Sequence, residues 1–412
     1  MRLHPFIFTG VASVLVAISP ASGQGVAISA ARVFDGAGAW LSNATVVVEE
    51  GRIRSVGALP AGFRGLRYDL GNATLMPGLM DVHVHLAWHF NAKGRLHSGD
   101  DGETATAGML AIAGNAYATL LAGVTTIQSP GSSEDKELKE AINRGTIPGP
   151  RVLTSLGSLN ERSGDADQIR QRVRQFKERG ADLIKLFASA SIRDGGAPTM
   201  SFEQVSAACD EAHKIGLRVL VHAHAAAAMN IASRARCDQI EHGMLSDQAA
   251  LQLAADNGVY LSPQCGLVID NYLQNRAKFE GIGNYNEEGF AAMRNSETAR
   301  IASIRNAVNT RGLKVLFGTD AVAGAHGRNA EELVCRVQRG GQSVQDALVS
   351  AMALAAESMG LADSLGTVKA GMLADLIAVP GDVRQDITRM QRVHFVMKRG
   401  VVYRNDAPGG AR

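Results

Sequence analysis

Two histidines stand two residues apart in the stretch Met76-Pro-Gly-Leu-Met-Asp-Val-His-Val-His85, a spacing that could hold a metal ion. Side chains two residues apart on a β-strand point to the same face, so His83 and His85 would present two nitrogen donors to one point. Neutral imidazole nitrogens are common ligands of zinc and similar divalent cations. An isolated pair of this kind is more often a solvated strand end, so the metal interpretation depends on partners further along the chain.

Further side chains of ligand type recur where buried strands are expected to end: Lys185, His222, His224, His242 and Asp320. Each has a plainer explanation, such as a core histidine bonded to a carbonyl or an aspartate that caps the next helix. We expect one of His222 and His224 to be a ligand and the other to be a hydrogen-bonding neighbour. Asp320 is favoured as the catalytic base, because the other candidates leave the site without one.

Lys185 needs a separate argument, because a buried cation beside bound metal ions would be repelled and costly to desolvate. Its position makes chemical sense if the amine is neutral and takes up carbon dioxide as a carbamate, whose two oxygens could bridge two cations. The alternative is a lysine whose stem packs in the core while its head reaches solvent.

The chain between these positions alternates buried runs with amphipathic segments, which predicts strand–helix units and a parallel sheet. Strands are expected at 79–85, 123–128, 151–156, 182–188, 218–224, 239–243, 259–263 and 314–319. Helices are expected between them, for example at 166–179, 201–215, 225–236 and 247–257. Eight such units favour an α/β fold of the (β/α)8 TIM barrel type over residues 79–365. A doubly wound open sheet is the second choice, but no glycine fingerprint for a dinucleotide follows any strand.

Both ends of the chain show a period-two pattern instead. Short antiparallel strands are expected at 26–33, 44–49, 52–56, 393–397 and 401–404. We therefore expect a small β-sandwich domain built from residues 24–78 and 366–412.

Residues 1–23 have the pattern of a secretory signal peptide: Arg2, an apolar run at 6–18, and the small residues Ala21-Ser22-Gly23. The mature protein is then expected to be exported, and so periplasmic or secreted. No other stretch approaches the length of a membrane span, and a formal net charge of +2 gives no reason to expect binding to nucleic acid.

Four cysteines, Cys209, Cys237, Cys265 and Cys335, allow three pairings in an exported chain. A chain of 412 residues can bury a core that needs no disulfides, so free thiols are the favoured expectation, with pairing left open.

Together these motifs resemble the amidohydrolase superfamily over the whole expected mature chain. The resemblance rests on Met76 to His85, Ile184-Lys185, Val221-His-Ala-His224, Ile240-Glu-His-Gly243, Gly318-Thr-Asp-Ala-Val-Ala-Gly324 and, in the C-terminal sandwich, Gly366 to Asp375. Within the superfamily, the chain is most similar to the metal-dependent Xaa-Pro dipeptidase-like and imidazolonepropionase-related group. That resemblance implies one metal ion on His83, His85 and Asp320. It implies a second ion on His222 and His242, with carboxylated Lys185 bridging the two.

The reaction implied is hydrolysis of an amide bond in a peptide or N-acyl amino acid by a hydroxide that two divalent ions, zinc first, generate. Asp320 would take the proton and pass it to the departing amine. His224 is the expected substrate contact. Weaker candidates are His89 on a long loop expected at 87–102, Tyr272 on a long loop expected at 265–288, and His326 just after Asp320. The group resemblance also implies a homo-oligomer.

Two other functions stay open. A cyclic-amide hydrolase or deaminase of the imidazolonepropionase type would use one metal ion without a bridging lysine, so Lys185 counts against it. An exported binding protein without turnover would need no base, so Asp320 counts against it.

Overall fold

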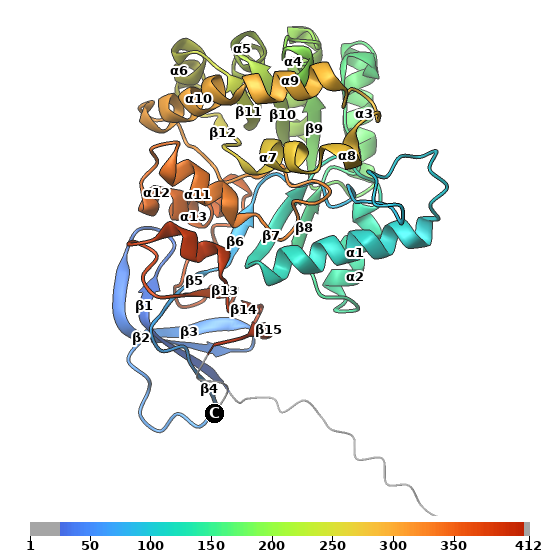
Figure 1. Ribbon diagram of the computed structural model, residues 1–412. Coiled ribbons are helices and arrows are strands. Elements are labelled where there is room, and N and C mark those ends of the chain that lie inside the picture. The colour runs from blue at the N-terminus through green and yellow to red at the C-terminus, as the bar shows by residue number, and fades with distance from the viewer. Residues whose placement is uncertain (1–24, 408–412) are drawn as a thin grey trace, which may run out of the picture.

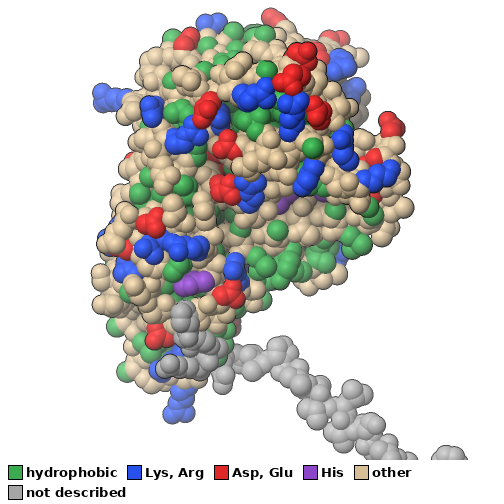
Figure 2. Space-filling view, viewed as in Figure 1, with side chains coloured by type: hydrophobic (Ala, Val, Ile, Leu, Met, Phe, Trp, Pro, Cys, Tyr) green, Lys and Arg blue, Asp and Glu red, His purple; other side chains and the backbone are tan. Residues whose placement is uncertain are grey.

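The computed structural model describes residues 25–407, so the expected signal peptide lies outside the described residues. Figure 1 shows a β-rich body, formed by both ends of the chain, beside a larger body of strands covered by helices. On the face seen in Figure 2, acidic and basic side chains are interspersed, and hydrophobic side chains gather along the first long helix. None of the described helices is long and apolar enough to cross a membrane.

One eight-stranded sheet joins the two ends of the chain. Its members are β1 (Val26–Phe34), β2 (Trp40–Glu49), β3 (Arg52–Gly57), β4 (Leu66–Asp69), β5 (Ala73–Pro77), β13 (Leu376–Pro380), β14 (Phe395–Lys398) and β15 (Val401–Asn405). The two ends meet where β13 pairs antiparallel with β5 and Ile377 lies opposite Met76. The strands expected at both ends are therefore present, while the sandwich arrangement and the boundaries at 78 and 366 stay predictions.

The middle of the chain forms two parallel sheets. One contains β6 (Leu79–Asp81), β7 (Val124–Ser129) and β8 (Arg151–Thr154), and the other contains β9 (Leu183–Phe187), β10 (Arg218–Ala225), β11 (Gln239–Leu245) and β12 (Tyr260–Ser262). The helices between these strands are α1 (Ala105–Leu121), α2 (Asp135–Asn143), α3 (Ala166–Glu178), α4 (Phe202–Lys214), α5 (Ala226–Arg234) and α6 (Gln248–Asp256). Their order confirms the predicted α/β class.

The eighth expected strand, 314–319, is not assigned as one, but its backbone bonds to strands on both sides. The N–H of Leu316 donates to the carbonyl of Leu261 beside β12 (2.8 Å). On the other side, the N–H of Val82 donates to the carbonyl of Phe317 (3.0 Å). This segment therefore links the last strand of one parallel sheet to the first strand of the other.

The second half of the chain is mostly helical: α7 (Leu267–Gln274), α8 (Arg276–Phe279), α9 (Glu287–Asn295), α10 (Glu297–Asn309), α11 (Ala330–Gln338), α12 (Val344–Ser350) and α13 (Ala353–Ser358). Three short 3-10 helices complete the described elements: η1 (Glu161–Ser163), η2 (Ile192–Asp194) and η3 (Ile387–Gln391). The expectation of a long loop at 265–288 was wrong. The segment folds into α7, α8 and the start of α9 because Ile269, Tyr272 and Phe279 pack into one buried apolar cluster.

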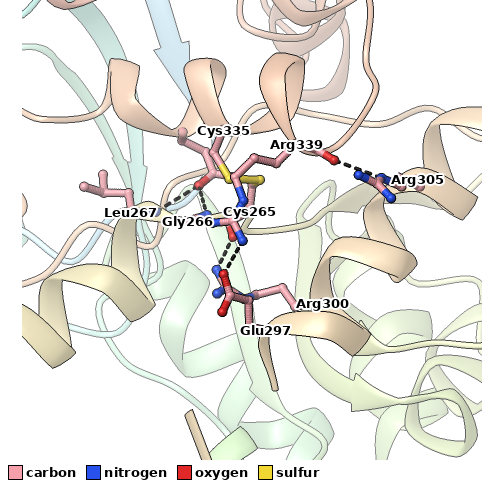
Figure 3. The surroundings of a disulfide bond; sticks show 9 residues. Cys265, Gly266, Leu267, Glu297, Arg300, Arg305, Cys335 and Arg339 are labelled. Atoms are coloured by element: carbon pink, nitrogen blue, oxygen red, sulfur yellow. Dashed lines mark hydrogen bonds and ion pairs between the residues drawn. A yellow bond between two sulfur atoms is a disulfide. The ribbon is translucent and has the colours of Figure 1, made fainter. Parts of the chain in front are cut away.

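All four cysteines form disulfides, so the favoured expectation of free thiols was wrong. Cys209 on α4 pairs with Cys237 just before β11, and Cys265 pairs with Cys335 on α11. Figure 3 shows the second bond at the segment that leads into α7, where Arg300 also donates to the carbonyl of Cys265. Pairing depends on which Cα atoms the fold brings within about 6 Å, and core size does not determine that.

Candidate metal centre and active site

A cavity of about 380 Å³ lies where the parallel strands end, and it collects the expected ligands. Its wall includes His85, Lys185, His222, His224, His242 and Asp320. His83 is 1% exposed and contacts His85, Lys185 and Asp320. The structure thus brings together side chains from β9, β10 and β11 and from the segments that follow β6 and residue 314, as the strand-end reasoning predicted.

Three of these side chains converge just beyond β6. The Nε2 atoms of His83 and His85 are 3.1 Å apart, and Oδ1 of Asp320 lies 3.5 Å from the first and 3.2 Å from the second. Two ligands at about 2.0–2.1 Å from one tetrahedral ion lie roughly 3.3 Å from each other. The spacing of the three donor atoms therefore suits a single cation.

A second group adjoins the first. His222, His224 and His242 each offer a ring nitrogen, and these nitrogens all lie within 4.8 Å of one another. Nζ of Lys185 is 3.4 Å from Nε2 of His83, which links the two groups. Both β10 histidines face the site, so the geometry leaves open which of His222 and His224 is the ligand.

Burial controls the protonation of this cluster. The pKa values of His83, His222 and His242 lie well below 6.5, mainly because burial penalises the charged imidazolium. Burial also lowers the pKa of Lys185, although the nearby charges of Glu241 and Asp320 oppose that shift. These shifts favour neutral nitrogens, which is the form that binds metal ions.

Burial does not decide the pKa of Asp320, in contrast to the histidines and Lys185. Burial alone would raise the pKa of its carboxyl group, but its interactions with His83, His85 and Lys185 together outweigh burial, so the pKa falls below its ordinary value of 3.8. The cluster therefore contains one ionised carboxylate among neutral imidazoles.

Two side chains that the sequence reasoning missed orient the histidine rings. Oε2 of Glu241 lies 2.9 Å from Nδ1 of His83, and Oε1 of Gln264 lies 2.7 Å from Nδ1 of His242. When Nδ1–H donates to such a partner, the tautomer is fixed and Nε2 keeps its lone pair for a metal ion. Glu241 was visible inside the Ile240-Glu-His-Gly243 motif, but no spacing rule pointed to Gln264.

The backbone that carries the ligands is tied together by Asp81, which is fully buried. Its carboxylate accepts the N–H groups of His83 (3.1 Å) and Thr319 (3.0 Å) and the side-chain N–H of Asn329 (2.8 Å). Asp320, which follows Thr319 in the chain, is held as well, because its N–H donates to the carbonyl of His83 (2.7 Å). Asp81 therefore sets the distance between two proposed ligands that are far apart in sequence.

Two ligand candidates stand in the left-handed backbone region, His242 with φ of 78° and Asp320 with φ of 53°. Non-glycine residues rarely adopt this conformation, and each such residue costs about 1–3 kcal/mol. The surrounding bonds must hold both residues in place, and such strained positions cluster at functional sites.

The four candidate substrate contacts divide into two pairs. His224 and Tyr272 line the cavity. His89 and His326 do not: Nε2 of His89 is 2.5 Å from Oε1 of Glu103, and Nε2 of His326 is 3.1 Å from the carbonyl of Trp88. His89, His97 and Glu103 form a separate group of possible metal ligands on the loop after β6. A residue not foreseen, Arg193 on η2, also lines the cavity.

The profile of the amidohydrolase family matches residues 74–403. The chain belongs to this family. The resemblance drawn from the motifs is thereby confirmed, and this amidohydrolase is an enzyme that hydrolyses amide bonds.

Its relatives cover nearly its whole length. The amidohydrolase is 26% identical to the ochratoxinase of Aspergillus niger, over 93% of its own chain and 87% of that protein. The crystal structure of a Xaa-Pro dipeptidase with bound methionine is 28% identical with a TM-score of 0.83, covering 93% of this chain and 100% of that one. A prolidase complexed with N-methylphosphonate-L-proline has 25% identity and a TM-score of 0.82, with the same coverage.

We expect this centre to bind zinc, and replacing Glu241 by glutamine should weaken that binding by about 10- to 100-fold, because the carboxylate 2.9 Å from Nδ1 of His83 is lost. Competition with a chromogenic chelator measures the affinity. The matched control is Glu332→Gln, which alters another fully buried glutamate that instead accepts the N–H groups of Gly266 and Leu267. Equal zinc affinity in the Glu241→Gln and wild-type proteins would refute the orienting role.

Proposed function

We propose that this amidohydrolase uses two divalent metal ions, zinc first, to cleave the amide bond of dipeptides and N-acyl amino acids. The observation that carries the proposal is the set of donor atoms around His83. Its Nδ1 faces Glu241, while its Nε2 faces His85, Lys185 and Asp320, all within 3.5 Å. A cation between these atoms would satisfy buried lone pairs that otherwise oppose one another.

The donors fit two ions. His83, His85 and Asp320 would hold one, and His222 and His242 would hold the other, with His224 as the alternative ligand on β10. When bound, such ions supply a hydroxide at neutral pH and polarise the carbonyl oxygen of the substrate.

Lys185 would bridge the two groups as a carbamate. Its neutral amine would attack carbon dioxide, forming an N–C bond as one C=O π bond opens and releasing a proton, and the resulting carbamate carries one negative charge shared by two oxygens. Its low exposure of 1% and the absence of any ion pair to it in residues 25–407 support an amine that is uncharged before the reaction. The modification would turn a neutral amine into an anion that binds metal ions.

Asp320 would move the proton. Its carboxylate is 15% exposed and opens to the cavity, so it can accept a proton from the attacking water and then protonate the departing nitrogen. His224, on the same wall, is placed to contact the substrate near the scissile bond. The apolar part of the wall, which includes Val268, Ile269 and Tyr272, would take the side chain or acyl group.

Substrate class is inferred from the cavity together with the relatives. The Xaa-Pro dipeptidase among its solved neighbours is named for dipeptides with proline on the leaving side, and the apolar and aromatic wall of this cavity suits a bulky acyl group or side chain. We therefore propose dipeptides, including those with proline on the leaving side, and N-acyl aromatic amino acids.

Two structural proposals accompany this function. We propose that the two parallel sheets and segment 314–321 close into one eight-stranded barrel, supported by the bonds of Leu261 and Val82 to that segment and by the N–H of Asp182, which donates to the carbonyl of Thr154 (2.8 Å). We also propose that the protein is exported, supported by the two disulfides, which persist in oxidising compartments. Assembly into a homo-oligomer stays a prediction.

A panel of dipeptides and N-acyl amino acids, incubated with the zinc-loaded enzyme and read by amine release, tests the function. We expect turnover of at least one class, and loss of about 10²- to 10⁴-fold in the Asp320→Asn variant, because the amide cannot shuttle the proton. Metal content should stay close to that of the wild type, which separates lost chemistry from a lost site. A variant that turns over at the wild-type rate would contradict the role of Asp320.

Replacing Lys185 by alanine should remove the bridge and most activity, and short carboxylates such as acetate or propionate should restore part of it by occupying the vacated space. The control is Lys139→Ala, which removes a lysine that is ion-paired with Asp182 (2.6 Å) outside the cavity. Full activity of Lys185→Ala without added carboxylate would exclude the carbamate.

A further inference from the structure

Arg193 is a cation in the cavity wall to which the mechanism above gives no task. It lies on η2, the short 3-10 helix after β9. The helix is anchored by Ile192, which is buried in the same apolar cluster as Tyr272 and Tyr285. The position of the guanidinium is therefore set by packed neighbours.

Asn284 and two tyrosine rings contact the Arg193 side chain and hold it in place. Its Nε donates to Oδ1 of Asn284 (2.7 Å), and Asn284 in turn donates to Asp194 (2.6 Å). The guanidinium carbon lies 4.2 Å from the ring centroid of Tyr285 and 5.8 Å from that of Tyr272. These contacts fix the plane of the guanidinium and use only the Nε–H as a hydrogen-bond donor.

The charge of Arg193 has no counter-charge in the described chain. Arg193 is partly buried, and none of the ion pairs formed within residues 25–407 includes it. Beside it, the hydroxyl of Tyr285 is buried and has no hydrogen-bond partner. A cation and an unused hydroxyl donor thus stand together in the wall of one cavity.

We propose that Arg193 and the hydroxyl of Tyr285 bind the free carboxylate of the amino acid on the leaving side of the scissile bond. With Nε occupied by Asn284, the two terminal amino groups remain, and their parallel N–H bonds match the two oxygens of a carboxylate. Binding there supplies the missing counter-charge and the acceptor that Tyr285 lacks. The inference rests on the proposed function and narrows it to substrates that end in a free carboxylate next to the cleaved amide.

The consequence is a substrate preference. A substrate whose terminal carboxylate is replaced by a primary amide would leave the Arg193 charge unpaired in the cavity. Because a hydrogen bond to a charged group contributes roughly 1.5–3 kcal/mol, we expect kcat/KM for the free acid to exceed that for the amide by about 10- to 100-fold. Internal amide bonds of longer peptides should be poor substrates for the same reason.

The test compares cleavage of the same acyl bond in an N-acyl amino acid and in its C-terminal primary amide. Arg193→Gln should lose the preference, with kcat/KM for the acid falling about 10- to 100-fold, mainly through KM, and with the amide little changed. Arg193→Lys keeps the charge but not the paired N–H groups and should retain part of the preference. The control Arg276→Gln alters another arginine stacked on an aromatic ring, 5.0 Å from the Phe290 centroid and outside the cavity wall, and should keep the wild-type preference.

The outcomes of this comparison separate a failure of the further inference from a failure of the proposed function. A wild-type enzyme that cleaves acid and amide equally, or an Arg193→Gln variant that keeps the preference, overturns the inference while leaving the proposed function intact. A wild-type enzyme that cleaves neither compound nor any dipeptide refutes the proposed function itself. Thermal unfolding of each variant guards against misfolding. If Arg193→Gln does not fold, Asn284→Ala replaces it, because releasing Nε should reduce the same preference.

Discussion

Nitrogen and oxygen lone pairs that face one another in a buried space repel unless a proton or a cation lies between them, and the architecture of this site follows from that constraint. Burial keeps the imidazoles of His83, His222 and His242 uncharged, so they have no positive charge with which to satisfy the Asp320 carboxylate. Pairs of donor atoms 3.1–3.5 Å apart are then stable around a shared cation. Glu241 and Gln264, behind the rings, fix the tautomers that leave the lone pairs directed inward.

The fold maintains this arrangement with backbone bonds between segments that are far apart in the chain. Asp81 joins His83 to Thr319, and the disulfide at Cys265 ties the segment that leads into α7, one wall of the cavity, to α11. Two ligand candidates have left-handed backbone: His242 inside β11 and Asp320 just after segment 314–319. The backbone strain at His242 and Asp320 is tolerated because bonds to adjacent segments hold the residues around them in place.

Much of this could be predicted from sequence because the relevant signals are local. Buried runs between amphipathic segments located seven of the eight expected parallel strands, and strand-end histidines located the cluster of candidate ligands. What depended on tertiary contact was missed or wrong: the cysteine pairing, the helices over 265–288, and the placement of His89 and His326 outside the cavity. Gln264 and Arg193 were missed because single polar residues at no fixed spacing acquire a role only from the neighbours that the fold supplies.

The number and position of bound ions test the central claim most directly. Metal analysis of the purified enzyme, combined with anomalous diffraction at the zinc edge, should give two ions per chain, one among His83, His85 and Asp320 and the other beside His242. Continuous density from the amine of Lys185 should lie between them. A single ion per chain with an unmodified lysine would contradict the account and would favour the mononuclear cyclic-amide hydrolase or deaminase instead.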